Sequence, residues 1–147
     1  MKIQLRAYSA TYFEKVNHYF PKKEIDRYTN RGYYFLLSLL GIYKSFFHLL
    51  INEDNLLGCG VIRWKYSKET HCFGWWLYGI WINPDYRGQR LGIVLMENLF
   101  NKLREKHIKR VYLIVRINNV VAINLYNKLG FVTIKENDTY KVMQYEL

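Results

Sequence analysis

Apolar and polar side chains alternate at the start of the chain. Residues 3–7 follow a period of two, which predicts a half-buried first strand. Thr11 and Glu14 have the spacing of a capping box, so we expect a helix over residues 12–20. Pro21 ends that helix because it cannot continue the backbone hydrogen-bond pattern.

Residues 33–51 are the longest apolar stretch, and a short helix is expected just before it, over residues 24–30. The stretch approaches the length of a membrane span, but Lys44 and His48 interrupt it. We therefore expect a buried helix followed by a strand. A membrane-facing or oligomer-forming surface is the alternative that the pattern leaves open.

The second half of the chain alternates strands with helices. A turn at residues 53–55 leads back into a strand over residues 56–64, which forms a hairpin with the strand before it. A run over residues 73–82 is apolar on both faces and therefore predicts a central strand. After Gly92, apolar residues recur at helical spacing. The remaining elements are expected as a strand over 111–115, a helix over 119–129, and a hairpin of 131–135 with 140–147.

This order of elements predicts a mixed α/β fold in one domain, residues 1–147. Half of the residues are apolar and 18% are aromatic, which excludes a disordered chain. The net charge of +10 suits an acidic partner, but the basic residues are scattered, so nucleic acid is not the expected one. Cys59 and Cys72 lack the spacing of a zinc site or a disulfide framework, and residues 1–10 hold no signal-peptide core. We expect a cytoplasmic protein without a metal.

The segment from Leu77 to Ile93 carries the first candidate chemistry. Its strand ends at Asn83-Pro84, and residues 87–93 form a loop that enters a helix N-terminus with two glycines. Free N–H groups and the positive end of the helix dipole at such a junction favour a pyrophosphate. The segment has neither the lysine of a P-loop nor the glycine spacing of a dinucleotide fold.

A second segment, residues 119–131, begins with a capping asparagine and ends at a glycine. Together the two segments resemble the GNAT superfamily of acyl-CoA-dependent N-acyltransferases. The residues that match its motifs are Arg87 and Gly92 in the first, and Asn119, Ala122, Leu125, Tyr126, Gly130 and Phe131 in the second. The resemblance covers residues 45–147. It implies the GNAT fold, a mostly antiparallel sheet with a splayed parallel pair of strands, flanked by about four helices.

The resemblance also implies a set of site residues. Backbone groups of Ile80, Trp81 and Ile82 would pair with the pantetheine of acetyl-CoA, and the amide near Ile80 would stabilise the oxyanion. Tyr126 would be the general acid for the departing thiolate, and Asn119 and Tyr126 would both contact the cofactor. The pyrophosphate would be held by the loop residues Arg87, Gly88, Gln89, Arg90, Leu91, Gly92 and Ile93.

One position departs from the family pattern, because Arg90 stands where the loop usually has its central glycine. A side chain there is tolerated if residue 90 has right-handed helical geometry, and is strained if the residue needs a positive φ. The sequence leaves both geometries open, and Arg90 would add a cation beside the phosphates.

The general base is not identified by sequence. The predicted central strand, 73–82, holds no carboxylate, and Ile114 stands where the similar bacterial ribosomal-protein acetyltransferases have a glutamate. This argues against a ribosomal-protein acceptor. A site without a base suits an amine of low pKa, since an α-amino group near 7.7–8.0 is far easier to deprotonate than a lysine near 10.4. The remaining candidate bases are His48, His71, Glu53 and Asp54.

The resemblance thus implies an acetyl-CoA-dependent enzyme that transfers the acetyl group to a primary amine of a small acceptor by direct attack on the thioester. Acetylation of a sugar or lipid-linked amine at a membrane surface is a second interpretation, prompted by residues 33–51. A non-catalytic acyl-CoA-binding module is a third. The sequence leaves a homo-oligomer open.

Overall fold

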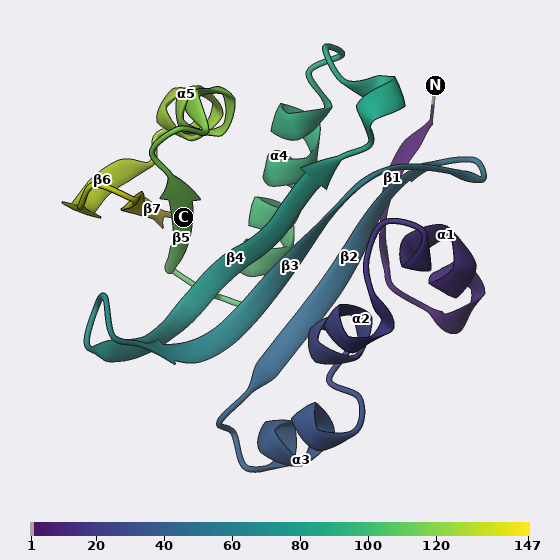
Figure 1. Ribbon diagram of the computed structural model, residues 1–147, viewed down its shortest axis with the longest axis horizontal. Coiled ribbons are helices and arrows are strands. Elements are labelled where there is room, and N and C mark those ends of the chain that lie inside the picture. The colour runs from purple at the N-terminus through teal and green to yellow at the C-terminus, as the bar shows by residue number, and fades with distance from the viewer. Residues whose placement is uncertain (1) are drawn as a thin grey trace.

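A computed structural model describes residues 2–147 and arranges them around a seven-stranded sheet (Figure 1). The strand order is β1-β2-β3-β4-β5-β7-β6, and neighbouring strands are antiparallel except for β4 and β5. The predicted mixed, mostly antiparallel sheet with one parallel pair is therefore confirmed. The strands are β1 Ile3–Ala7, β2 Lys44–Asn52, β3 Asn55–Ser67, β4 Cys72–Ile82, β5 Arg110–Arg116, β6 Val132–Glu136 and β7 Tyr140–Glu146.

The β4 strand lies in the middle of the sheet, as its apolar pattern predicted. Its pairing with β5 is confined to one register pair, Trp76 with Tyr112. Beyond that pair the two strands separate toward their carboxyl ends, toward α5 and the loop before α4 (Figure 1). The separation opens the sheet next to the predicted cofactor loop.

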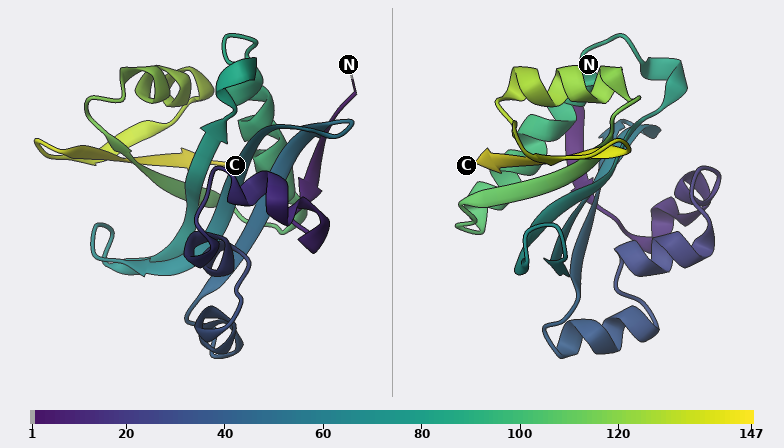
Figure 2. Two further views of the ribbon diagram at one scale, coloured as in Figure 1. Left: turned by 45° about the vertical axis from the view of Figure 1, so that its right-hand side comes forward. Right: turned by 60° about the vertical axis from the view of Figure 1, so that its left-hand side comes forward.

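Helices cover both faces of the sheet (Figure 2). The short helices α1 Phe13–Asn17, α2 Lys22–Tyr28 and α3 Tyr33–Leu39 lie on one side. The longer α4 Leu91–Glu105 and α5 Val120–Leu129 lie on the other. Two 3-10 turns, Ala10–Tyr12 and Pro84–Tyr86, complete the elements.

Each face has its own hydrophobic core. The helical spacing of Leu95, Leu99 and Leu103 places all three against the sheet, where none is exposed. They pack with residues of β5, α5 and β7 in the larger cluster. On the other face, Val16 of α1 and Ile25 of α2 are fully buried against β2 and β3.

The predicted buried helix within residues 33–51 is wrong in its burial. The helix α3 forms, but none of its residues is buried, and Leu39 and Leu40 are 69% and 70% exposed. The hydrophobicity of a segment indicates that it can be buried, but not whether the fold supplies a surface to cover it. Here α3 lies beyond the lower end of the sheet, so none of the seven strands covers it (Figure 1). The strand predicted after it is β2, which is buried over most of its length. Among residues 2–147, no helix is both long and apolar enough to cross a membrane.

The predicted helix over residues 12–20 is also shorter than expected, because the chain forms a 3-10 turn and then only Phe13–Asn17 as α1. The capping box is absent: the Thr11 hydroxyl lies 2.7 Å from the Ser9 hydroxyl and caps no backbone N–H. Local hydrogen bonding between two hydroxyl groups thus competes with helix capping.

Candidate active site

A β-bulge interrupts β4 near its carboxyl end. Gly60 of β3 faces two residues of β4, Gly79 and Ile80, and Gly79 has a φ of +54°. Position 60 has no room for a side chain, since a Cβ there would lie 2.7 Å from Leu99 Cδ1 and 3.0 Å from Ile80 Cδ1. A bulge leaves one residue out of the ladder, so backbone groups at this point are available for other partners.

The chain after β4 is anchored to the sheet by two side chains. Asn83 Nδ2 donates to the Leu56 carbonyl at 2.9 Å, and Asn83 Oδ1 accepts from the Asp85 N–H at 3.2 Å. Arg87 Nε donates to the Ile82 carbonyl at 3.1 Å. Arg87 therefore holds the loop against the end of β4, and its terminal nitrogens remain available for an anion.

Of the two geometries that the sequence leaves open for Arg90, the structure has the strained one. Arg90 has φ +59° and ψ 15°, in the left-handed region, and Gly88 has φ +81°. A side chain in the left-handed region costs about 1–2 kcal/mol, which glycine avoids. The loop therefore needs the conformation that the family's glycine supplies, and this chain adopts it with arginine.

The loop presents a row of unpaired backbone donors. Within residues 2–147, the N–H groups of residues 88–92 donate to no backbone acceptor, whereas the N–H of Ile93 donates to the Arg90 carbonyl at 3.0 Å. Ile93 is thus a weaker candidate donor than the sequence suggested. The remaining donors stand at the N-terminus of α4, a 15-residue helix whose dipole favours an anion there.

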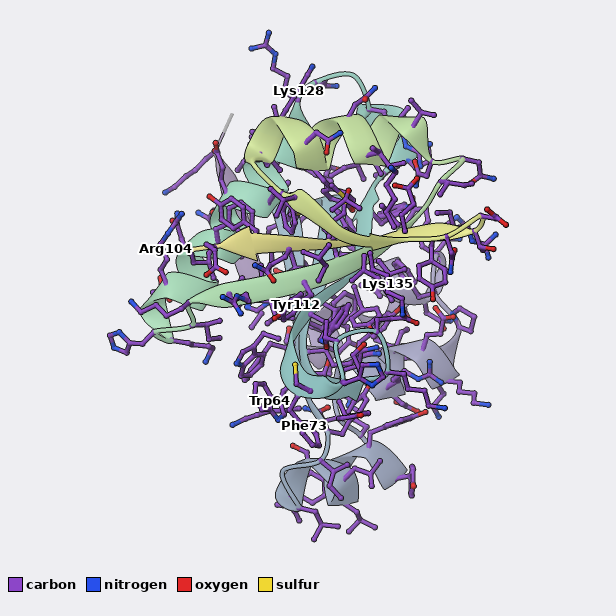
Figure 3. All side chains as sticks on the ribbon, turned by 90° about the vertical axis from the view of Figure 1, so that its left-hand side faces the viewer. Trp64, Phe73, Arg104, Tyr112, Lys128 and Lys135 are labelled. Carbon is purple, nitrogen blue, oxygen red and sulfur yellow. The ribbon has the colours of Figure 1, made fainter. Side chains whose placement is uncertain are left out.

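A cavity of about 570 Å³ lies between this loop and α5. From the predicted site residues it gathers Ile82, Arg87, Gly88, Arg90, Leu91, Gly92 and Ile93. From α5 the cavity adds Val121, Asn124, Leu125 and Lys128. Of these four, only Leu125 belongs to the sequence motif, and none was predicted as a site residue. Residues spaced by three and four lie on one face of a helix, so the sequence pattern could have indicated that these side chains point the same way. Lys128, near the end of α5 (Figure 3), adds a cation.

Five predicted site residues do not line this cavity: Ile80, Trp81, Gln89, Asn119 and Tyr126. Ile80 stands in the bulge, and Gln89 is exposed in the loop. Trp81 packs on Tyr19, with 4.4 Å between ring centroids. Asn119 is the predicted N-cap of α5, accepting from the Ala122 N–H at 3.2 Å.

Tyr126 lies on the buried side of α5. It is only 7% exposed, and its ring centroid is 5.5 Å from that of Phe131. Its hydroxyl makes no hydrogen bond with any residue in 2–147. Burial raises the pKa of Tyr126 to about 12, well above the value of about 10 for an ordinary phenol.

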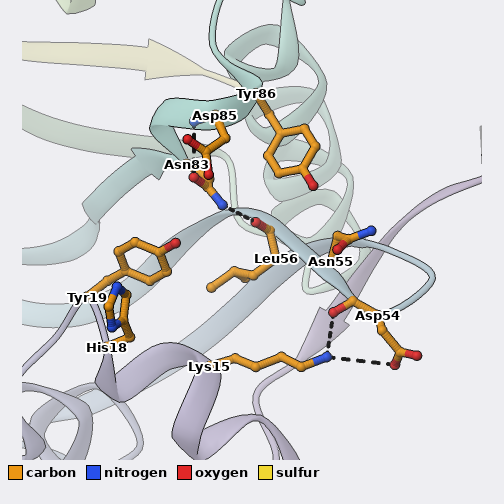
Figure 4. A pocket seen from close by; sticks show the side chains of 9 residues that line it. All are labelled: Lys15, His18, Tyr19, Asp54, Asn55, Leu56, Asn83, Asp85 and Tyr86. Carbon is orange, nitrogen blue, oxygen red and sulfur yellow. Dashed lines mark hydrogen bonds and ion pairs between the residues drawn. The ribbon is translucent and has the colours of Figure 1, made fainter.

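A second cavity, of about 350 Å³, lies near the same end of β4 between α1 and the β2–β3 turn (Figure 4). Its lining includes His18, Tyr19, Asp54 and Asp85, with Asp54 paired to Lys15. Within residues 2–147, no three His, Cys, Asp or Glu side chains are grouped so as to hold a metal ion.

The candidate bases do not converge on the bulge. Glu53 and Asp54 lie in the β2–β3 turn, and His71 lies in the turn that leads into β4. His48 is buried on β2, and burial lowers its pKa. Ile114 of β5 is 41% exposed, on the same sheet face as Tyr112 two residues before it.

Comparison with known proteins gives a consistent picture. The profile of the acetyltransferase (GNAT) family matches residues 5–131. The ribosomal protein bS18-alanine N-acetyltransferase of Escherichia coli (strain K12) is 41% identical over 131 residues, covering 88% of this chain and 78% of the relative. An N-alpha-acetyltransferase of Sulfurisphaera tokodaii is 30% identical over 118 residues, covering 72% and 68%.

The fold recurs in solved structures. A GNAT family acetyltransferase from Elizabethkingia anophelis, crystallised with acetyl-CoA bound, superposes with a TM-score of 0.70. The superposition covers 99% of this chain and 98% of that one at 17% identity, which supports the fold alone.

Proposed function

The chain belongs to the acetyltransferase (GNAT) family and is an acetyl-CoA-dependent N-acetyltransferase, and we propose that its acceptor is the N-terminal α-amino group of a polypeptide. The relative with 41% identity acts on the alanine of ribosomal protein bS18, and the Sulfurisphaera relative is an N-alpha-acetyltransferase. These relatives favour a polypeptide over the small-molecule amine that we expected from sequence.

The observation that supports acetyl-CoA binding is the cavity between the loop 87–93 and α5, beside the splayed strands. The unpaired N–H groups of residues 88–92 would bind the pyrophosphate, with Arg87, Arg90 and Lys128 supplying positive charge. The pantetheine would run from there along the end of β4 to the bulge at Ile80.

Chemistry at the acceptor amine favours the same conclusion. Neither β4 nor Ile114 of β5 provides a carboxylate that could take a proton. An α-amine with a pKa near 7.7–8.0 is neutral often enough at pH 7 to react without one, at a cost of about 1 kcal/mol. A lysine side chain near 10.4 would cost about 4.6 kcal/mol. The nucleophile would therefore be an α-amine that loses its proton to water.

Two groups would stabilise the charges that develop. The backbone N–H at Ile80, placed in the bulge, would donate to the carbonyl oxygen as it becomes an oxyanion. Tyr126 would donate a hydrogen bond to the departing sulfur. With a pKa of about 12, full transfer of its proton to a thiolate near 8.5 is uphill, so hydrogen-bond donation is its main contribution.

The test follows release of free coenzyme A thiol from acetyl-CoA in the presence of peptides. We expect turnover with a peptide that has an N-terminal alanine, and none with the same peptide whose N-terminus is blocked and whose only amine is a lysine side chain. Mass spectrometry should locate the acetyl group on the α-amine. Acetylation of the lysine side chain or of small polyamines at equal rates would overturn the proposed acceptor.

A further inference from the structure

Arg63 of β3 is a buried cation without a counter-ion. It is 7% exposed, and its Nε and Nη2 atoms are enclosed without a hydrogen-bond partner. No carboxylate within residues 2–147 forms an ion pair with it. A charge removed from water in this way is costly unless another group compensates it.

Three tyrosine rings surround the guanidinium group of Arg63. Its central carbon lies 4.5 Å from the ring centroid of Tyr78, 5.0 Å from Tyr43 and 5.5 Å from Tyr28. Cation–π attraction offsets part of the cost of burial. It acts through the faces of the rings, however, and leaves the enclosed N–H donors without an acceptor.

Lys65, two residues further along β3, is a second cation beside the same tyrosine. Its Nζ lies 5.0 Å from the Tyr78 ring centroid and 4.8 Å from the Trp76 ring. Burial, and then repulsion from Arg63, lower the pKa of Lys65. The nearby Glu69 pairs with Lys135 and so neutralises neither cation directly.

This cluster of Arg63 and Lys65 around Tyr78 lies close to the predicted reaction centre. Tyr78 is two residues before Ile80, so the two lie at most about 7 Å apart along the chain, with the bulge at Gly79 between them. The Tyr28 hydroxyl lies 3.5 Å from where a Cβ on Gly79 would be. The cluster also lies on the α2 side of the sheet, whereas the cavity between the loop 87–93 and α5 lies on the α4 side.

We propose that Arg63 and Lys65 bind a carboxylate of the acceptor, so that the enzyme prefers polypeptides with aspartate or glutamate at the second or third residue. The inference rests on the proposed function. An extended peptide advances about 3.3–3.6 Å per residue, so a side chain one or two residues from the reacting amine reaches the cluster. A carboxylate beside the cluster would attract Arg63 and Lys65 and would neutralise one of their two positive charges.

The experiment compares three peptides that share an N-terminal alanine and differ only at the second and third residues. Both of these residues are aspartate in the first peptide, asparagine in the second and lysine in the third. The value of kcat/KM for each is measured from thiol release with acetyl-CoA. We expect the aspartate peptide to exceed the asparagine peptide about tenfold or more, and the lysine peptide to be the poorest. The preference should weaken as salt is added.

Variants test whether the cluster causes the preference. Arg63→Met should reduce the aspartate-to-asparagine ratio to about one, and Lys65→Met should reduce it in part. Arg104→Met is the matched control, because Arg104 also stacks on an aromatic ring, that of Phe100. Arg104 lies on α4 (Figure 3), on the opposite face of the sheet from the cluster. It should keep the wild-type ratio. Circular dichroism checks folding, and Lys65→Met keeps the test open if Arg63→Met does not fold.

The outcomes separate the two proposals. Equal kcat/KM for the aspartate and asparagine peptides in the wild type would overturn the carboxylate subsite and leave the proposed function standing. A wild-type preference that survives in both cluster variants would place its origin elsewhere and also overturn the subsite. If no peptide α-amine is acetylated at all, the proposed function fails and this inference fails with it.

Discussion

Replacing Tyr126 with phenylalanine removes one hydroxyl group at the predicted leaving-group position. The ring contact with Phe131 remains, and the hydroxyl gives up no hydrogen bond with any residue in 2–147. The free energy of unfolding should therefore change by less than about 0.5 kcal/mol. The variant should bind acetyl-CoA nearly as tightly as the wild type, because the cavity between the loop and α5 does not include Tyr126.

Turnover should fall much more than stability. A hydrogen bond to a charge that develops only in the transition state is typically worth about 10²–10³ in rate, or about 2.7–4 kcal/mol. We therefore expect kcat for Tyr126→Phe to drop by about that factor. The loss should shrink with an activated thioester, whose thiolate needs less stabilisation as it leaves.

The assay is thiol release under saturating acetyl-CoA, with calorimetric titration of coenzyme A to measure binding separately. Tyr145→Phe is the matched control, since Tyr145 packs against Phe131 in the same aromatic group, at 5.2 Å between centroids. It should leave kcat unchanged. A loss below about threefold in Tyr126→Phe would assign the tyrosine to packing and the protonation of sulfur to water.

The pH dependence offers a further check on the same residue. Burial raises the pKa of Tyr126 to about 12, so the hydroxyl stays protonated and able to donate throughout the ordinary assay range. The value of kcat/KM for the peptide should rise with pH through about 7.7–8.0, as the α-amine of the free acceptor loses its proton, and then level off. A fall in rate between pH 8 and 10 that disappears in Tyr126→Phe would contradict the raised pKa.

Five further substitutions test the loop and the fold. Gly92→Asp places a negative charge at the proposed pyrophosphate site, and calorimetry should show coenzyme A affinity reduced at least tenfold in a folded protein; unchanged affinity would remove the phosphate-loop assignment. Arg90→Gly should leave the melting temperature nearly unchanged, because relief of the left-handed strain is offset by glycine's greater freedom in the unfolded chain. It should weaken coenzyme A binding a few-fold, and equal affinity would end the charge role of Arg90. Lys128→Ala should also weaken binding a few-fold and lessen its salt dependence. Leu40→Ser should change stability by less than about 0.5 kcal/mol, whereas Leu99→Ala should cost about 3 kcal/mol in urea unfolding, and similar values would contradict the exposure of the α3 region.

Elements with local signals were predictable from sequence. Asn119 caps α5 and Gly130 ends it in the left-handed conformation, and both effects act within a single helical turn. The family membership that this segment helped to predict is confirmed by the match over residues 5–131. The central place of β4 was predictable because a strand that is apolar on both faces is typically covered on both sides.

Features that depend on distant residues were not predictable in the same way. The apolar α3 was expected inside, but whether it finds a partner depends on where the rest of the sheet ends. Arg63 reads as one polar position in a strand, and only the fold brings Tyr28, Tyr43 and Tyr78 around it. The geometry of Arg90 could not be decided beforehand, because a single sequence does not reveal which residue takes a positive φ.

The absence of a carboxylate base on β4 and the positive charge of Arg63 and Lys65 both affect the protonation state of the acceptor amine. A protonated amine that approaches Arg63 and Lys65 is repelled, and nearby positive charge lowers the pKa of a bound amine. The enzyme would thus bind the neutral amine, whose proton has already passed to water. A carboxylate base in the site would then not be needed. A carboxylate side chain of the acceptor would be attracted to Arg63 and Lys65, while the α-amine of the same acceptor remains free to attack the thioester. On this argument, the same two cations select the acceptor and prepare its amine. The pKa of the bound amine, read from the pH dependence of kcat at saturating peptide, should rise in Arg63→Met.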